Sequence, residues 1–152
     1  MFDKIWRLFK KDNLNEINDK YILVPESKIC ENSKRNIVEL ERLGEESSEI
    51  LQRKYANVFE SQGKHNLRIW IYRDIDGDEI KALTSEKCLE KEYRSQIAID
   101  YDGRKFDDDF YAITIELWYY FGGYSKGSGR LYDLSKNDLE TDIEEALISL
   151  LK

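Results

Sequence analysis

The stretch Asp107–Phe121, DDDFYAITIELWYYF, decides the fold that we expect, because it is the longest apolar run in the chain and its polarity alternates. Side chains two residues apart share one face of a β-strand, and β-branched and aromatic residues favour strands. We therefore predict a long central strand whose odd-numbered residues face the core. One face would carry Tyr111, Ile113, Ile115, Leu117, Tyr119 and Phe121, and the other Phe110, Ala112, Thr114, Glu116, Trp118 and Tyr120.

Two shorter stretches show the same alternation. Leu67–Arg73 would place Leu67, Ile69 and Ile71 inward, and Gln96–Tyr101 would do the same with Ile97, Ile99 and Tyr101. The Asp-Gly pairs at 76–77 and 102–103 are typical of hairpin turns, which favours antiparallel pairing. Further strands are expected at Tyr21–Val24 (ended by Pro25), Ile37–Leu43, Ile80–Leu83 and Arg130–Leu134.

Helical spacing of apolar residues predicts helices at Glu45–Gln62, Ser85–Arg94 and Ser135–Lys152. Ser47 or Ser48 would cap the first of these, and Ser135 the last. Ile37–Leu43 fits a helix as well as a strand, and we expect a strand that Gly44 ends. Residues 1–12, MFDKIWRLFKKD, predict a short amphipathic helix that docks on the domain, with a membrane-surface helix as the alternative. The whole chain, 1–152, is expected to form one α+β domain: a mostly antiparallel sheet of four to six strands with packed helices, including a C-terminal helix.

Charge and composition narrow the class of protein. The chain has a net charge of -7, and its segment Asp74–Glu116 holds 13 acidic and 6 basic residues. Nucleic acids and anionic membranes attract basic surfaces, so neither is an expected partner. Cys30 and Cys88 lack a CxxC spacing, which favours reduced thiols. The N-terminal stretch lacks the continuous apolar core of a signal peptide, so we expect a cytoplasmic protein.

No catalytic or cofactor motif stands out in the sequence. Asp74, Asp76 and Asp78 surround Gly77, but a calcium loop would then need carboxylates where Tyr72 and Leu83 stand. His65 is the only histidine, so it has no second histidine as a metal-ligand partner. We therefore predict no metal site and no cofactor, and we expect that the protein is not an enzyme. A metal-dependent hydrolase or nuclease that uses Asp74, Asp76, Glu79 and Lys81 is the alternative.

The remaining signal indicates protein binding. Aromatic residues ringed by charge are typical of binding hot spots. The outer face of the sheet would carry Trp70, Tyr72, Trp118 and Tyr120, unless a helix covers it and makes it a second core layer. Acidic residues gather near the expected turn after Tyr101. The predicted partner-binding residues are Tyr101, Asp102, Asp107, Asp108, Asp109, Glu116, Trp118 and Tyr120.

We hypothesise a non-catalytic binding protein, such as a bacterial immunity or antitoxin-type inhibitor that neutralises a basic toxin, for example a nuclease. An acidic surface accelerates the capture of a cationic protein. A third hypothesis is a structural subunit that forms a homodimer or larger homo-oligomer through the aromatic face.

Overall fold

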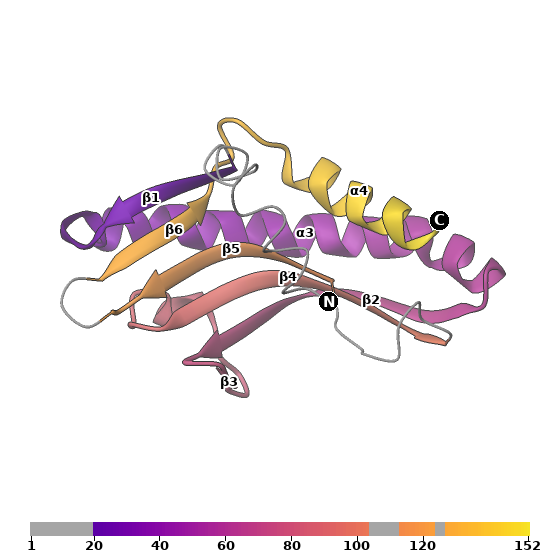
Figure 1. Ribbon diagram of the computed structural model, residues 1–152, viewed down its shortest axis with the longest axis horizontal. Helices are drawn as coiled ribbons and strands as arrows, with labels where there is room; N and C mark the ends of the chain where they lie inside the picture. The colour runs from indigo at the N-terminus through magenta and orange to yellow at the C-terminus, as the bar shows by residue number, and fades with distance from the viewer. Residues whose placement is uncertain (1–19, 104–112, 124–126) are drawn as a thin grey trace.

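The computed structural model describes residues 20–103, 113–123 and 127–152, in which a six-stranded antiparallel sheet carries two α-helices (Figure 1). The predicted α+β class and antiparallel sheet are confirmed. The expected helix at residues 1–12 lies outside the described residues. The helices are α3 (Glu31–Ser61) and α4 (Leu139–Leu150), with short 3-10 turns η1 (Glu26–Lys28) and η2 (Ser85–Lys87). The strands are β1 (Tyr21–Pro25), β2 (Lys64–Ile75), β3 (Asp78–Glu79), β4 (Tyr93–Gly103), β5 (Ile113–Phe121) and β6 (Ser128–Tyr132).

The strand order is β1-β6-β5-β4-β2-β3, so the predicted central position of β5 is confirmed. The turn at Asp76 and Gly77 joins β2 to β3 as expected, and both residues have the positive φ angles of a two-residue hairpin turn. β3 pairs at only two positions, whereas a longer returning strand at Ile80–Leu83 was predicted. β6 lies between β1 and β5 and is therefore not an edge strand.

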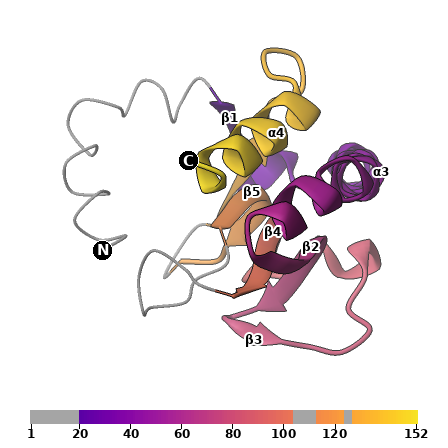
Figure 2. The same cartoon turned by 90° about the vertical axis from the view of Figure 1, so that its right-hand side faces the viewer.

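Both helices lie on one face of the sheet, α3 along its length and α4 beside α3 (Figure 2). The predicted inward residues of β2 and β4 form this core, since Leu67, Ile69, Ile97 and Ile99 are all buried. The Lys54 ammonium pairs with Glu144 at 2.8 Å and links the two helices. The predicted apolar face of the C-terminal helix also packs here, through Leu139, Ile143 and Leu147.

The predicted strand at Ile37–Leu43 is wrong, because this segment belongs to the 31-residue helix α3. Ile37, Leu40, Gly44 and Leu51 are buried at helical spacing. Glycine normally weakens a helix by about 1 kcal/mol. Here α3 passes so close to the sheet that a Cβ at position 44 would lie 3.0 Å from the Ile97 Cδ1 atom. Close packing, which the sequence does not reveal, explains why the helix continues through Gly44.

The other helix boundaries also differ from those predicted. Within the predicted helix Ser85–Arg94, only Ser85–Lys87 is helical, as the turn η2, and Tyr93 already begins β4. The Thr84 hydroxyl caps η2 by accepting a hydrogen bond from Glu86 N–H. α4 begins at Leu139 rather than at Ser135. The Asp133 carboxylate instead holds Ser135 in a turn by accepting its backbone N–H at 2.9 Å. A local side-chain bond of this kind competes with helix formation.

A β-bulge in β5 reverses the predicted orientation of its last residues. Ser95 pairs with Trp118 while Gln96 pairs with Glu116, so Leu117 is the extra residue. Leu117 and Trp118 are consequently both 0% exposed in the helix-side core. Beyond the bulge the alternation is shifted: Tyr120 is buried and Phe121 is 49% exposed. The prediction that Trp118 and Tyr120 lie on the outer face, and Tyr119 and Phe121 on the inner face, is therefore wrong.

Candidate functional site

Trp118 and Tyr120, two of the predicted partner-binding residues, belong to a second core cluster with Ile37, Cys88 and Tyr93. The Trp118 indole N–H donates to the Cys88 carbonyl at 2.8 Å. The Tyr120 hydroxyl donates to Glu26 at 3.3 Å, and burial, followed by the charge of Glu26, raises the pKa of the Tyr120 phenol. Both side chains therefore have partners within the fold and do not lie on the outer face where they were predicted.

Glu116 is partly buried and also has partners within the fold. Its carboxylate accepts a hydrogen bond from Arg130 Nε at 2.6 Å. The same guanidinium lies 5.7 Å from the centre of the Tyr21 ring. The hydrogen bond that Arg130 donates to Glu116 is the main cause that raises the pKa of Arg130. The negative charge predicted to attract a partner is thus neutralised on the sheet itself.

Only part of the predicted acidic surface falls within the described residues. Tyr101 is 6% exposed, and its ring packs edge-on against Phe59 at 5.8 Å between centroids. Asp102 is exposed and accepts hydrogen bonds from Asn66 Nδ2 at 2.9 Å and Arg68 Nη2 at 3.2 Å. Asp107, Asp108 and Asp109 lie outside the described residues, so the structure does not test their predicted role.

The residues named for the alternative metal-dependent site are not arranged as metal ligands. Asp74 is 2% exposed and pairs with Arg94 Nη2 at 3.0 Å. Asp76, Glu79 and Lys81 are exposed at or after the turn that follows β2. Within the ranges that the structure describes, no group of three His, Cys, Asp or Glu side chains is placed to hold a metal ion.

A buried carboxylate beneath α3 is a feature that the sequence did not indicate. Glu41 is 1% exposed and accepts hydrogen bonds from Arg73 Nε and from the Tyr93 hydroxyl, each at 2.8 Å. Burial, followed by the negative charge of Glu41, raises the pKa of Tyr93 well above its usual range. A buried charge must be paired and hydrogen-bonded, and these two partners satisfy that need. Glu41 therefore joins α3 to β2 and β4.

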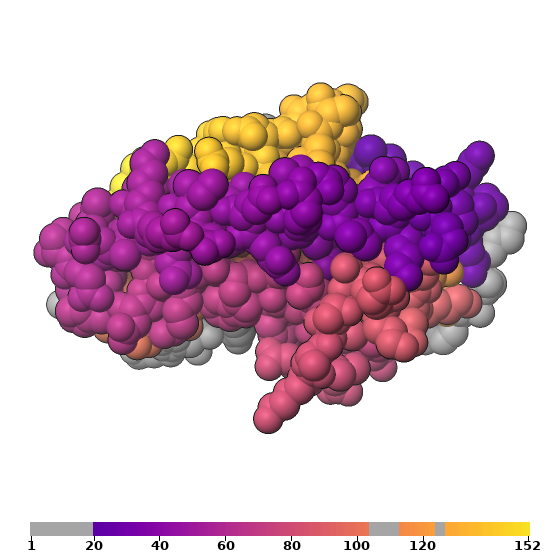
Figure 3. Space-filling view, turned by 180° about the vertical axis from the view of Figure 1, so that it is seen from behind, coloured from indigo at the N-terminus to yellow at the C-terminus, as the bar shows by residue number. Residues whose placement is uncertain are grey.

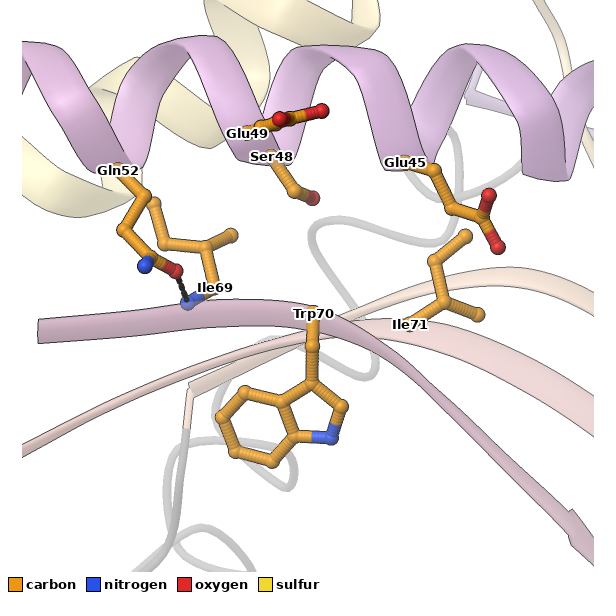
Figure 4. A pocket seen from close by; sticks show the side chains of 7 residues that line it. All are labelled: Glu45, Ser48, Glu49, Gln52, Ile69, Trp70 and Ile71. Carbon is orange, nitrogen blue, oxygen red and sulfur yellow. Dashed lines mark hydrogen bonds between the residues drawn. The ribbon is translucent and has the colours of Figure 1, made fainter. Parts of the chain in front are cut away.

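A groove runs between α3 and β2, with a volume of about 340 Å³ (Figure 4). The Gln52 side chain crosses it and accepts the Ile69 backbone N–H at 2.8 Å. The Ser48 side chain projects from α3 toward β2, and its buried hydroxyl has no hydrogen-bond partner among the residues that the structure describes. The groove is lined by Glu45, Ser48, Glu49, Gln52, Ile69, Trp70 and Ile71.

Two carboxylates stand at the mouth of this groove. The side chains of Glu45 and Glu49 are 59% and 67% exposed, and each has an arginine neighbour: Arg73 for Glu45 and Arg53 for Glu49. Exposed ion pairs of this kind contribute little to stability, so the carboxylates remain available to a cationic group.

A second hollow of about 220 Å³ lies beside the same strand. It is bounded by the segment from Glu79 to Leu83, and it shares Trp70 and Ile71 with the groove under α3. Seen from the side of α3, the molecule shows the helix above and the segment after β3 projecting below it (Figure 3). The two hollows are therefore neighbours along β2, at Trp70 and Ile71.

The sequence did not predict this groove or its lining residues. Ser48 was predicted as a helix cap because serine favours that position, but α3 begins 17 residues earlier, at Glu31. The one available signal was a polar serine and glutamine, Ser48 and Gln52, on the helical face that also carries Leu51.

Among the described residues, neither helix combines the length and the apolar character needed to cross a membrane. Comparisons with protein-family models, with curated proteins and with solved structures give no match.

Proposed function

We propose that this chain is a non-catalytic cytoplasmic protein that binds a basic protein partner, as an immunity or antitoxin-type inhibitor binds a basic toxin. The observation that carries the proposal is the groove between α3 and β2. It combines two exposed carboxylates, Glu45 and Glu49, with the buried Ser48 hydroxyl, for which the described residues supply no hydrogen-bond partner. Polar groups placed in a groove recognise a ligand without supplying a nucleophile and a base.

The overall charge supports the choice of partner. The net charge of -7 favours the approach of a cationic protein and disfavours nucleic acid. Cys30 and Cys88 are free thiols, which suits a reducing compartment such as the cytoplasm. Asp107, Asp108 and Asp109 remain predicted contributors to the capture of the partner, since they carry three adjacent negative charges.

The two other functional classes have less support. For the metal-dependent hydrolase, Asp74 would have to leave its ion pair with Arg94 before it could ligand a metal. For the aromatic homo-oligomer, burial of Trp118 and Tyr120 leaves Trp70 and Tyr72 from the predicted set on the outer face. Both alternatives stay predictions that no specific contact favours.

The test is affinity capture from the source organism, followed by purification of the captured protein and measurement of its association rate at several salt concentrations. We expect a basic partner in a one-to-one complex, whose activity the chain inhibits. Replacing Glu45 and Glu49 by Gln should slow association and reduce its dependence on salt. The matched control is Glu46→Gln, which removes one charge from α3 outside the groove and within an ion pair with Arg42.

An absence of any basic partner would contradict the proposal. Equal association rates and equal salt dependence for the wild type and the groove variant would also contradict the role of the groove. A partner whose binding depends on an added divalent cation would favour the hydrolase alternative instead.

A further inference from the structure

The side of β2 that faces away from β4 is largely unpaired. β3 covers only Asp74 and Ile75, so within the described residues the stretch Lys64–Arg73 has no partner strand on that side. Unpaired strand edges carry backbone donors and acceptors that can template the addition of another strand. Other proteins bind extended peptides in this way, with main-chain hydrogen bonds giving affinity and side-chain pockets giving specificity.

The direction of the backbone groups can be read from one hydrogen bond. Ile69 N–H donates to Gln52 of α3 and therefore points away from β4. Backbone groups of residues two apart in a strand point the same way. The N–H and C=O of Ile71 consequently point toward the open side, and no hydrogen bond joins them to another described residue. Ile71 also lines both hollows.

We propose that an extended segment of the basic partner adds to β2 as a further strand, between α3 and the segment that follows β3. This inference rests on the proposed function and names its mode of binding. The hydrogen bonds would be made by Ile71 N–H and C=O and by the Ile69 carbonyl. Ile69 N–H would stay with Gln52 or exchange its partner.

The residues on each side of the groove indicate which side chains the added partner strand would carry. Residues directly opposite each other on neighbouring strands share one face of the sheet. Partner residues opposite Ile69 and Ile71 would therefore face α3, where Glu45 and Glu49 stand at the groove mouth. The partner residue between them would share a face with Trp70, whose ring points away from α3 and is 37% exposed (Figure 4). We expect Lys or Arg at alternate positions with an apolar residue between them.

The Ser48 hydroxyl is an independent observation that points to a ligand at the same place. It is buried, has no hydrogen-bond partner within the described part of the chain, and projects from α3 toward β2 within the groove. A buried polar group without a partner is unfavourable in the free protein. A basic side chain entering the groove would supply a donor to this oxygen. A purely structural role predicts that Ser48→Ala leaves binding unchanged, whereas this proposal predicts weaker binding without loss of stability.

The test is a selection of displayed random eight-residue peptides on the wild-type protein. We expect enriched peptides that lack proline, carry Lys or Arg at alternate positions and bind in a one-to-one ratio. Methylating a peptide backbone nitrogen that faces β2 should abolish binding, whereas methylating the next nitrogen, which faces outward, should preserve it. Ser48→Ala should weaken binding about threefold or more with an unchanged or higher unfolding midpoint. Replacing Glu45 and Glu49 by Gln should weaken peptide binding about tenfold, whereas Glu46→Gln should leave peptide binding unchanged.

Binding that tolerates methylation at every position, or that is indifferent to Ser48→Ala and to loss of both carboxylates, would overturn the proposal. If the purified basic partner still bound in that case, the proposed function would stand and only the strand-addition mode would fail. If neither peptides nor a basic protein bound, both would fail. A doubled mass of the free protein without peptide binding would assign this edge to a second copy of the chain and would equally overturn the proposal.

Discussion

Gly129→Ala should destabilise the protein through a collision with one buried ring. A Cβ at position 129 would lie 2.1 Å from the Trp118 Cη2 atom and 2.4 Å from Cζ3. A normal carbon contact is roughly 3.5 Å, so the indole would have to move by about 1.4 Å. Trp118 is 0% exposed, and its N–H is bonded to the Cys88 carbonyl at 2.8 Å, so the core opposes this movement.

The expected cost follows from three effects. Overpacking a core costs about 1–3 kcal/mol, and loss of the indole hydrogen bond adds about 0.5–1.5 kcal/mol. Replacing glycine by alanine restricts the unfolded chain and returns about 0.4–1 kcal/mol. The net decrease in the free energy of unfolding should be about 2 kcal/mol, within a range of roughly 0.5–4 kcal/mol, measured by urea denaturation followed by Trp fluorescence and circular dichroism. Ser128→Ala, at the neighbouring position of β6, is the matched control and should change it by less than about 0.5 kcal/mol.

A double-mutant cycle isolates the collision from other effects of the substitution. Trp118→Leu removes the ring atoms that a Cβ at position 129 would meet, so Gly129→Ala should cost little in that background. A Gly129→Ala protein as stable as the wild type would refute the placement of Trp118 on the helix side of the bulge. An equal cost of Gly129→Ala in both backgrounds would refute the collision as its cause.

Three further predictions concern the core and the thiols. Leu147→Ala should lower the free energy of unfolding by about 2–5 kcal/mol because Leu147 is 0% exposed, while Ile148→Ala, at 43% exposure, should have a much smaller effect in the same urea titration. Glu41→Ala should cost about 3–5 kcal/mol because it removes the buried carboxylate that accepts hydrogen bonds from Arg73 and from the Tyr93 hydroxyl, and an unchanged denaturation midpoint would contradict this. In a disulfide-exchange assay at neutral pH, Cys30 should react quickly because the pKa of its thiol is lowered. The main cause is a hydrogen bond that the Cys30 sulfur accepts from the backbone N–H of Ser33. Cys88 should react only after unfolding, since burial raises its pKa to about 12, and two fast thiols in the native protein would contradict the structure.

The parts of the fold that the sequence predicted are those governed by local patterns. Alternation in β2 and β4 correctly placed Ile69 and Ile97 in the core. The Asp76-Gly77 pair predicted its turn because both residues adopt positive φ, which these residue types tolerate. The spacing of Leu139, Ile143 and Leu147 predicted the buried face of α4.

The errors arise where distant segments decide the local structure. Gly44 was expected to end an element, yet its missing side chain lets α3 approach the sheet. The bulge at Leu117 shifts the alternation by one residue, and nothing in the order of residues in β5 marks it. That single shift moved Trp118 and Tyr120 from the predicted binding face into the core. Because side chains in a strand alternate with a period of two, one extra residue moves every side chain after it to the opposite face of the sheet.

The candidate site was missed for the same reason. The groove needs α3 and β2 side by side, with Ser48 and Ile69 on facing elements. These positions lie on consecutive elements, but they belong to common residue types, and their contact depends on how α3 packs against β2. The acidic character of the predicted partner surface came from composition. The structure adds that Glu45 and Glu49 lie beside the side of β2 that has no partner strand along Lys64–Arg73 among the described residues.

Amide hydrogen exchange at Ile71 tests the central claim most directly, because its N–H points toward the open side of β2. In the free protein this amide should exchange quickly, while the amide of Trp70, which pairs with Ala98 of β4, should be protected. Addition of a selected basic peptide or of the purified partner should slow the Ile71 amide strongly and leave the Trp70 amide nearly unchanged. A complex that forms without any change in exchange at Ile71 would contradict strand addition at this edge.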